Sequence, residues 1–279
     1  MAILLGLFAA LAWGTGDFAG GRAARKVPET AVVLGTELVG LVLLLGVALF
    51  TNGSPTAADL GIGALAGLVG VGGLALLYRG LAQGRASVVA PLSAVGAAIL
   101  QVTWGLANGE RPGFVAILGI GLALVAIAVV AGSAEQPTDT TGMRHSTEIQ
   151  CGLGAAVGFG VYLILLSETS SGAGLWTVVA ARAAPAAALL ILLPLLGRPW
   201  RIPRAAAPAV VIAGVTDAGA NALLLVAVRQ GLLSVVAPVA NLYPAITVLL
   251  ARAFGHERIG RGRIAGLALA VVALILISV

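Results

Sequence analysis

Ten long apolar stretches alternate with short polar segments along this chain. Each is close to the roughly 20 residues that an α-helix needs to cross the hydrocarbon core of a bilayer. They lie at residues 3–20, 31–50, 60–78, 86–107, 113–132, 150–167, 174–196, 205–228, 233–254 and 264–279. The apolar and polar residues do not alternate one by one as in a membrane β-barrel. The pattern therefore predicts an all-α membrane protein of ten transmembrane helices.

One polar segment, residues 133–148, is long enough to divide the chain. Five apolar stretches precede it and five follow it. We therefore expect two five-helix units, residues 1–132 and 149–279, joined by a polar linker at 133–148.

The two units repeat one another in sequence. Two motifs recur at an offset of 147 residues (234 − 87 = 147): Gln-Gly followed by Ser-Val-Val-Ala-Pro, at 83–91 and 230–238, and Glu-Arg, at 110–111 and 257–258. Such a pattern in register indicates a duplication. Because five is an odd number, the second unit enters the membrane from the opposite side, so we expect inverted repeats. Inverted repeats suit transport by alternating access.

Composition agrees with the membrane assignment. Hydrophobic residues make up 59% of the chain and charged residues only 10%, against about 25% charged in soluble domains. The single cysteine excludes an internal disulfide. The two histidines show no metal-ligand spacing, and no nucleotide-binding motif is present, so we expect no metal, no cofactor and no ATP drive.

The repeated motifs resemble those of the EamA-like ten-helix exporters of the drug/metabolite transporter superfamily. The resemblance rests on Trp13-Gly14, on Ala-Pro at 90–91 and 237–238, on Gly-Glu-Arg at 109–111 and on His-Glu-Arg at 256–258. It implies efflux or exchange of metabolites, amino acids or drugs, and it leaves the substrate open. We expect a small-molecule substrate and the lipid bilayer as partners, with no nucleic acid, in a monomer or weak homodimer.

The basic residues predict an orientation in the membrane. Thirteen of them fall in the connections that follow every odd-numbered helix: Arg22, Arg25, Lys26, Arg79, Arg85, Arg144, Arg198, Arg201, Arg204, Arg252, Arg258, Arg261 and Arg263. The opposite side holds Arg111 and Arg229. Because cytoplasmic loops are enriched in Lys and Arg, both termini are expected outside. The family resemblance implies both termini inside; we follow the charges. Lys26 as the sole lysine suggests a GC-rich bacterial genome and hence a bacterial inner (plasma) membrane.

Asp217 is the most informative ionisable residue within a predicted span. It lies about 12 residues into the eighth stretch, roughly 18 Å along the helix, and Asn221 follows on the same face. A charge at this depth costs about 3 kcal/mol on insertion scales. Asp217 is therefore interpreted as a proton- or cation-coupling carboxylate or as the counter-ion of a substrate amine. The alternative is a buried structural hydrogen bond.

Glu37 and Arg182 occupy nearly equivalent places in the two units (182 − 37 = 145). Opposite charges from the two units could form an ion pair that offsets the cost of burying each. A gating or substrate-binding role is the alternative. The family often carries Arg where this chain has Glu37.

Other polar and aromatic residues within the spans are candidates for lining a cavity. These are Trp13, Tyr162, Asn241 and Tyr243, together with Asp17, which could instead extend toward the basic loop at Arg22. Pro91, Pro238 and Pro244 are expected to kink their helices.

Together these features predict a secondary transporter that works by alternating access, with proton coupling as one option. The alternatives are a passive channel or facilitator and, with less support, a membrane-embedded enzyme.

Overall fold

The computed structural model describes residues 1–83, 86–132, 144–255 and 261–278, and within them the chain is helical with no strand. The elements are α1 (Ala2–Ala24), α2 (Glu29–Ala48), α3 (Ala57–Gln83), α4 (Ala86–Ala107), α5 (Phe114–Gly132), α6 (His145–Ser167), the 3₁₀ turn η1 (Ser171–Ala173), α7 (Trp176–Leu195), α8 (Ala207–Gln230), α9 (Leu233–Ala240), α10 (Tyr243–Gly255) and α11 (Arg261–Ser278). The residues of the polar linker at 133–143 lie outside this description, and α6 begins at His145.

The helices match the ten predicted spans closely. Six of them, α1, α2, α3, α6, α7 and α8, are long and apolar enough to cross a membrane, and four shorter apolar helical segments complete the set. Helices suit these segments because every backbone N–H and C=O is bonded within its own helix, as the hydrocarbon core demands. The ninth span is the exception, because it comprises two helices, α9 and α10.

The break between α9 and α10 falls at Asn241 and Leu242, just before Pro244. Pro244 cannot donate a backbone hydrogen bond and its ring crowds the preceding turn, which favours ending a helix there. The corresponding residue of the first repeat is Ala97 (244 − 147 = 97), and α4 runs without interruption through that position. Pro91 lies within α4 and Pro238 within α9. A kink at these two prolines stays a prediction.

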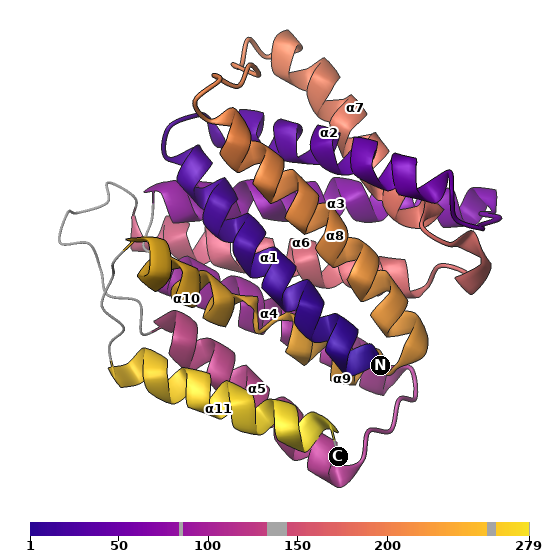
Figure 1. Ribbon diagram of the computed structural model, residues 1–279, viewed down its shortest axis with the longest axis vertical. Coiled ribbons are helices and arrows are strands. Elements are labelled where there is room, and N and C mark those ends of the chain that lie inside the picture. Colours follow the sequence, from indigo (N-terminus) through magenta and orange to yellow (C-terminus); the bar gives the residue numbers. More distant parts are fainter. Residues whose placement is uncertain (84–85, 133–143, 256–260, 279) are drawn as a thin grey trace.

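The two halves interlock rather than sit apart (Figure 1). Helix α1 packs along α8, and its counterpart α6 packs along α3; likewise α2 packs on α8, and α7 on α3. Helix α2 also packs against its own counterpart α7, as α5 does against α11. The core is therefore built from helices of both repeats.

Small residues allow the closest of these contacts. A Cβ added at Gly63 or Gly67 of α3 would overlap backbone atoms of Thr177 or Ala181 on α7. Glycines enable backbones to approach closely in membranes, where association depends on van der Waals packing.

Helix α7 ends at a glycine that the geometry requires. Gly197 has φ +62°, the left-handed region in which other residues are strained. The N–H of Gly197 donates to Pro194 O at 3.0 Å and that of Arg198 donates to Leu193 O at 2.8 Å, a Schellman motif. The turn directs the chain into the basic connection before α8.

The two termini lie at the same end of the helix bundle, and the basic connections between α1 and α2 and between α7 and α8 lie at the other end (Figure 1). Because the number of spans is even, the chain starts and finishes at one end.

Candidate functional site

One cavity, with an empty volume of ≈ 640 Å³ that is partly open to the exterior, lies in the middle of the bundle. The nine candidate site residues named from the sequence all line this cavity: Trp13, Asp17, Glu37, Tyr162, Arg182, Asp217, Asn221, Asn241 and Tyr243. They come from α1, α2, α6, α7, α8 and the α9–α10 break. The cavity therefore draws its polar groups from both repeats.

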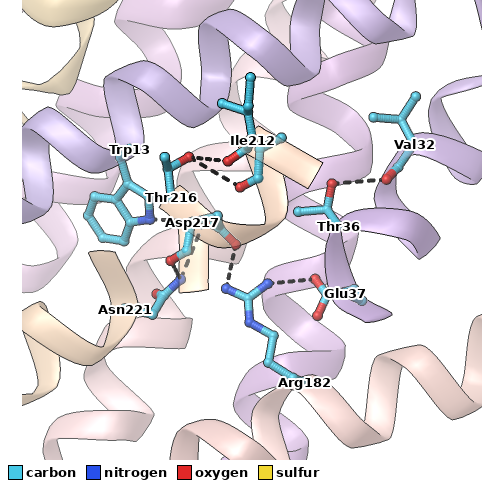
Figure 2. Close-up of polar contacts among 10 residues, drawn as sticks. Trp13, Val32, Thr36, Glu37, Arg182, Ile212, Thr216, Asp217 and Asn221 are labelled. Atoms are coloured by element: carbon cyan, nitrogen blue, oxygen red, sulfur yellow. Dashed lines mark hydrogen bonds and ion pairs between the residues drawn. The ribbon is translucent and has the colours of Figure 1, made fainter. Parts of the chain in front are cut away.

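Asp217, near the middle of α8, accepts hydrogen bonds from three directions (Figure 2). Its Oδ1 accepts from Trp13 Nε1 at 3.0 Å and from Asn221 Nδ2 at 3.3 Å. Its Oδ2 accepts from Arg182 Nη2. Asn221 also donates to the backbone O of Asp217 at 2.8 Å, which fixes the amide one turn along the same face. The aspartate thus ties α1, α7 and α8 together.

Arg182 bridges two carboxylates. Its Nη1 lies 3.1 Å from Glu37 Oε1, and its Nη2 pairs with Asp217 Oδ2. The contact between Glu37 and Arg182 is the ion pair that the repeat offset suggested. The second partner was missed, because Asp217 has a glycine, Gly70, at its repeat-related position and the offset therefore gave no sign of it. Glu37 and Arg182 are only 3% and 4% exposed, so each depends on the other charges for solvation.

Asp17 lines the cavity rather than pairing with the basic loop. It lies one helical turn after Trp13, on the same face of α1. No hydrogen bond or ion pair joins Asp17 to another residue in the described part of the chain.

Aromatic rings form much of the remaining wall. Trp13 and Tyr243 meet edge to face, with ring centroids 6.2 Å apart and planes at 75°, a favoured aromatic geometry. Tyr162 and Phe159 line the cavity from α6. Phe159 is the repeat counterpart of Trp13 (159 − 13 = 146).

Gln101 is a polar lining residue that the sequence analysis missed. Its Oε1 accepts from Asn241 Nδ2 at 2.8 Å, and its Nε2 donates to Phe159 O at 3.2 Å. Asn241 also donates to Ala237 O at 2.8 Å, at the broken end of α9. A lone glutamine deep in an apolar stretch was the available signal, since polar residues at such depth are costly.

Several polar atoms around the cavity lack a partner in the structure. They are Glu37 Oε2, Asn221 Oδ1 and Tyr162 Oη. Buried polar atoms are normally hydrogen-bonded, so these three atoms could accept hydrogen bonds from a polar guest or donate them to it. Among the described residues no group of three His, Cys, Asp or Glu side chains is placed to hold a metal ion.

A separate polar cluster closes the end of the bundle opposite the basic connections. Asp59 of α3 accepts from Ser170 N at 2.7 Å and from Thr56 N at 2.9 Å. Arg229 of α8 donates to Ser170 O at 3.0 Å and to Gly174 O at 3.1 Å. The connection between α6 and α7 is thereby fastened to helices of both repeats.

Comparison with known proteins agrees with this architecture. The chain matches the sequence profile of the EamA-like transporter family twice, over residues 1–132 and 146–279. Twenty-nine chains of solved structures are similar to it. One, described only as a crystal structure of a protein, aligns with a TM-score of 0.76 at 18% identity, over 99% of this chain and 95% of that one. No curated protein sequence matches. At this identity the structural likeness concerns the fold alone, whereas the family match covers both repeats: the chain belongs to the EamA-like transporter family, whose members carry small solutes across membranes.

Proposed function

We propose that this protein is a secondary transporter that exports or exchanges small metabolites, amino acids or drugs by alternating access. The observation that carries the proposal is the position of the charged cavity. It lies where the two repeats meet, near the middle of the helices. Secondary transporters built from repeats bind their solutes at such a place.

The cavity is lined by repeat-related pairs of residues. Both members of four pairs contribute to its wall: Trp13 and Phe159, Glu37 and Arg182, Gly70 and Asp217, and Leu74 and Asn221. Their offsets are 145–147 residues. In the last three pairs the two members differ in chemistry. Glu37 and Arg182 are opposite in charge, and Asp217 and Asn221 are polar where their counterparts are not. This supports a site on the pseudo-symmetry axis with a chemically asymmetric lining.

Inverted repeats over residues 1–132 and 149–279 account for the packing. The contact between α1 and α8 has its counterpart in the contact between α6 and α3, as expected if the two repeats share one fold in opposite orientations. An exchange of conformations between such repeats would open the cavity to the other side of the membrane. The polar cluster at Asp59 and Arg229 would then act as the gate at its end of the bundle.

Asp217 is our candidate for the coupling step. Uptake of a proton by this carboxylate would remove the charge that Arg182 and Trp13 recognise. Arg182 would keep Glu37 as its only ionised partner. Proton occupancy and solute occupancy could thereby compete for one network, which is what coupling to a proton gradient requires.

The test is transport by Asp217→Asn protein in liposomes. Asparagine keeps the shape and one acceptor oxygen and removes titration. The variant is expected to retain counterflow of solute and to lose accumulation driven by a pH gradient. Gradient-driven accumulation that survives with its pH dependence intact would assign Asp217 a structural role instead.

A passive channel is the remaining alternative. The same liposomes separate it from a carrier, because only a carrier shows saturable counterflow in which unlabelled solute inside accelerates uptake of labelled solute. Flux that stays linear with concentration would contradict the proposal.

A further inference from the structure

The cavity carries more acids than bases. Its ionisable lining residues are Asp17, Glu37 and Asp217, against one guanidinium, that of Arg182. When ionised, these groups leave two negative charges uncompensated in a low-dielectric region, where an unpaired charge is strongly unfavourable. A cationic guest would supply the missing positive charge, in competition with protons.

Several hydrogen-bond acceptors of the cavity remain unpaired after Arg182 has formed its two ion pairs. Both carboxylate oxygens of Asp217 accept hydrogen bonds, whereas Glu37 uses only Oε1, and its Oε2 is buried without a partner. Asn221 Oδ1 is likewise buried without a partner, in a side chain that is 3% exposed. Asp17 has no hydrogen bond or ion pair within the described residues. Three acceptor groups facing one cavity give it a negative lining that favours a cation.

The rest of the wall distinguishes an organic cation from a metal ion. Ca²⁺ takes about six to eight oxygen ligands, commonly from carboxylates, at roughly 2.3–2.6 Å, and among the described residues no three His, Cys, Asp or Glu side chains are placed to hold a metal ion. The lining instead includes four aromatic side chains, those of Trp13, Tyr243, Tyr162 and Phe159. Such rings attract ammonium groups over their faces and bury apolar bodies.

We propose that the cavity binds an organic cation, an ammonium group on an apolar or aromatic body. Asp17 and Glu37 bind the charge, and the rings of Trp13, Tyr162 and Tyr243 enclose the body. Arg182 pairs with Asp217 and with the other oxygen of Glu37, which leaves Glu37 Oε2 without a partner. This inference names a substrate class for the proposed transporter. Transport of the cation rests on the proposed function, whereas binding of the cation does not.

Binding is tested with the full-length protein in nanodiscs, by calorimetry. The probes are three permanent cations, tetramethylammonium, benzyltrimethylammonium and trimethyl(2-phenylethyl)ammonium, with 3-phenylpropanol and 3-phenylpropionate as neutral and anionic counterparts. The aromatic cations are expected to bind at least tenfold more tightly than either counterpart. Absence of binding by all three cations, or equal or tighter binding of the anion, overturns the proposal.

Asp17→Asn locates the site, because this residue has no partner to lose. The substitution is expected to raise the Kd of trimethyl(2-phenylethyl)ammonium at least tenfold, and Glu37→Gln is expected to do the same. Glu29→Gln, which removes one charge in the first turn of α2, serves as the matched control and leaves the Kd unchanged. A Kd that Asp17→Asn does not change, in protein with wild-type thermal stability, overturns the proposal.

Counterflow measurements separate this inference from the proposed function. Cation binding without counterflow would contradict the transporter and leave the cation site standing. Saturable counterflow of neutral or anionic solutes by a protein that binds no cation would support the transporter and overturn the cation site.

Discussion

At the scale of single residues, Arg182 has the largest expected effect on stability, because two buried carboxylates depend on it. Removing one partner of a buried ion pair typically costs about 3–5 kcal/mol, since the remaining charge is left uncompensated. We expect Arg182→Gln to lower the free energy of unfolding by about this amount. Urea unfolding in detergent micelles measures it.

The matched control neutralises the partners as well. The triple variant Arg182→Gln, Glu37→Gln and Asp217→Asn carries no charge in the network and is expected to recover most of the lost stability. If the single and triple variants unfold at the same urea concentration, the network does not contribute as an ion pair.

Glu110 makes a second testable contribution, by capping a helix of the other repeat. Its Oε1 accepts from Leu233 N at 2.8 Å and its Oε2 from Ser234 N at 2.7 Å, at the start of α9. Loss of a capping side chain typically costs about 0.5–2 kcal/mol. Glu110→Ala is expected to lower stability within this range, read from a thermal unfolding curve. Glu110→Gln keeps one acceptor and should lose less; equal stability of all three proteins would contradict the cap.

The candidate residues of the site could be found from the sequence, but their partners could not. Asp217, Arg182 and Glu37 stood out because charges are rare within apolar spans. The repeat offset then related Glu37 to Arg182. Nothing in the sequence related Arg182 to Asp217 or Gln101 to Asn241, since these contacts depend on how helices of different repeats rotate against one another.

At the scale of helices, α3 offers a sharp comparison between two glycines. A Cβ at Gly63 would overlap the backbone of Thr177 on α7, whereas a Cβ at Gly61 would meet nothing within 4 Å. Overpacking of this kind costs about 1–3 kcal/mol. We therefore expect Gly63→Ala to destabilise the protein and Gly61→Ala to leave it unchanged or slightly more stable, as a lipid-facing alanine favours helix.

Thermal unfolding of the two variants in the same detergent checks this expectation. Equal melting temperatures for Gly63→Ala and Gly61→Ala would show that α3 and α7 do not need close approach at this point.

The spans were predictable because length and hydrophobicity are properties of each helix alone. The break in the ninth span was predicted only as a kink at Pro244. A proline is compatible with a kinked helix and with a complete break between two helices. Asn241 is held at this point by the oxygens of Ala237 and Gln101, and the second of these lies on a helix far away in sequence.

At the scale of the whole molecule, the orientation in the membrane is open to direct test. The basic connections predict that the termini and the connection between α2 and α3 lie outside the cell. Single cysteines would replace Ser54 and Pro199, both exposed, in a Cys151→Ala background that fills the buried site with a small apolar side chain. We expect a membrane-impermeant maleimide to label position 54 but not position 199 in intact cells. Labelling at 199 and not at 54 would reverse the orientation.

The fold as a whole could be predicted because the duplication fixes helix number and order. The packing of helices from one repeat against helices of the other could not be predicted. Which helix of one repeat lies along which helix of the other depends on small-residue contacts such as those of Gly63 and Gly67, which are indistinguishable in sequence from glycines that face lipid.

The Glu37–Arg182 pair joins the two repeats, whereas the Asp217–Arg182 pair lies within the second one. Under the alternating access proposed above, a rotation of one repeat against the other would separate Glu37 from Arg182. For an empty molecule this separation would be part of the activation barrier, and each 1.4 kcal/mol would slow the step about tenfold. A guest that neutralises Glu37 would lower that barrier. In kinetic terms, the loaded protein would then change sides faster than the empty one, which would favour exchange over net release.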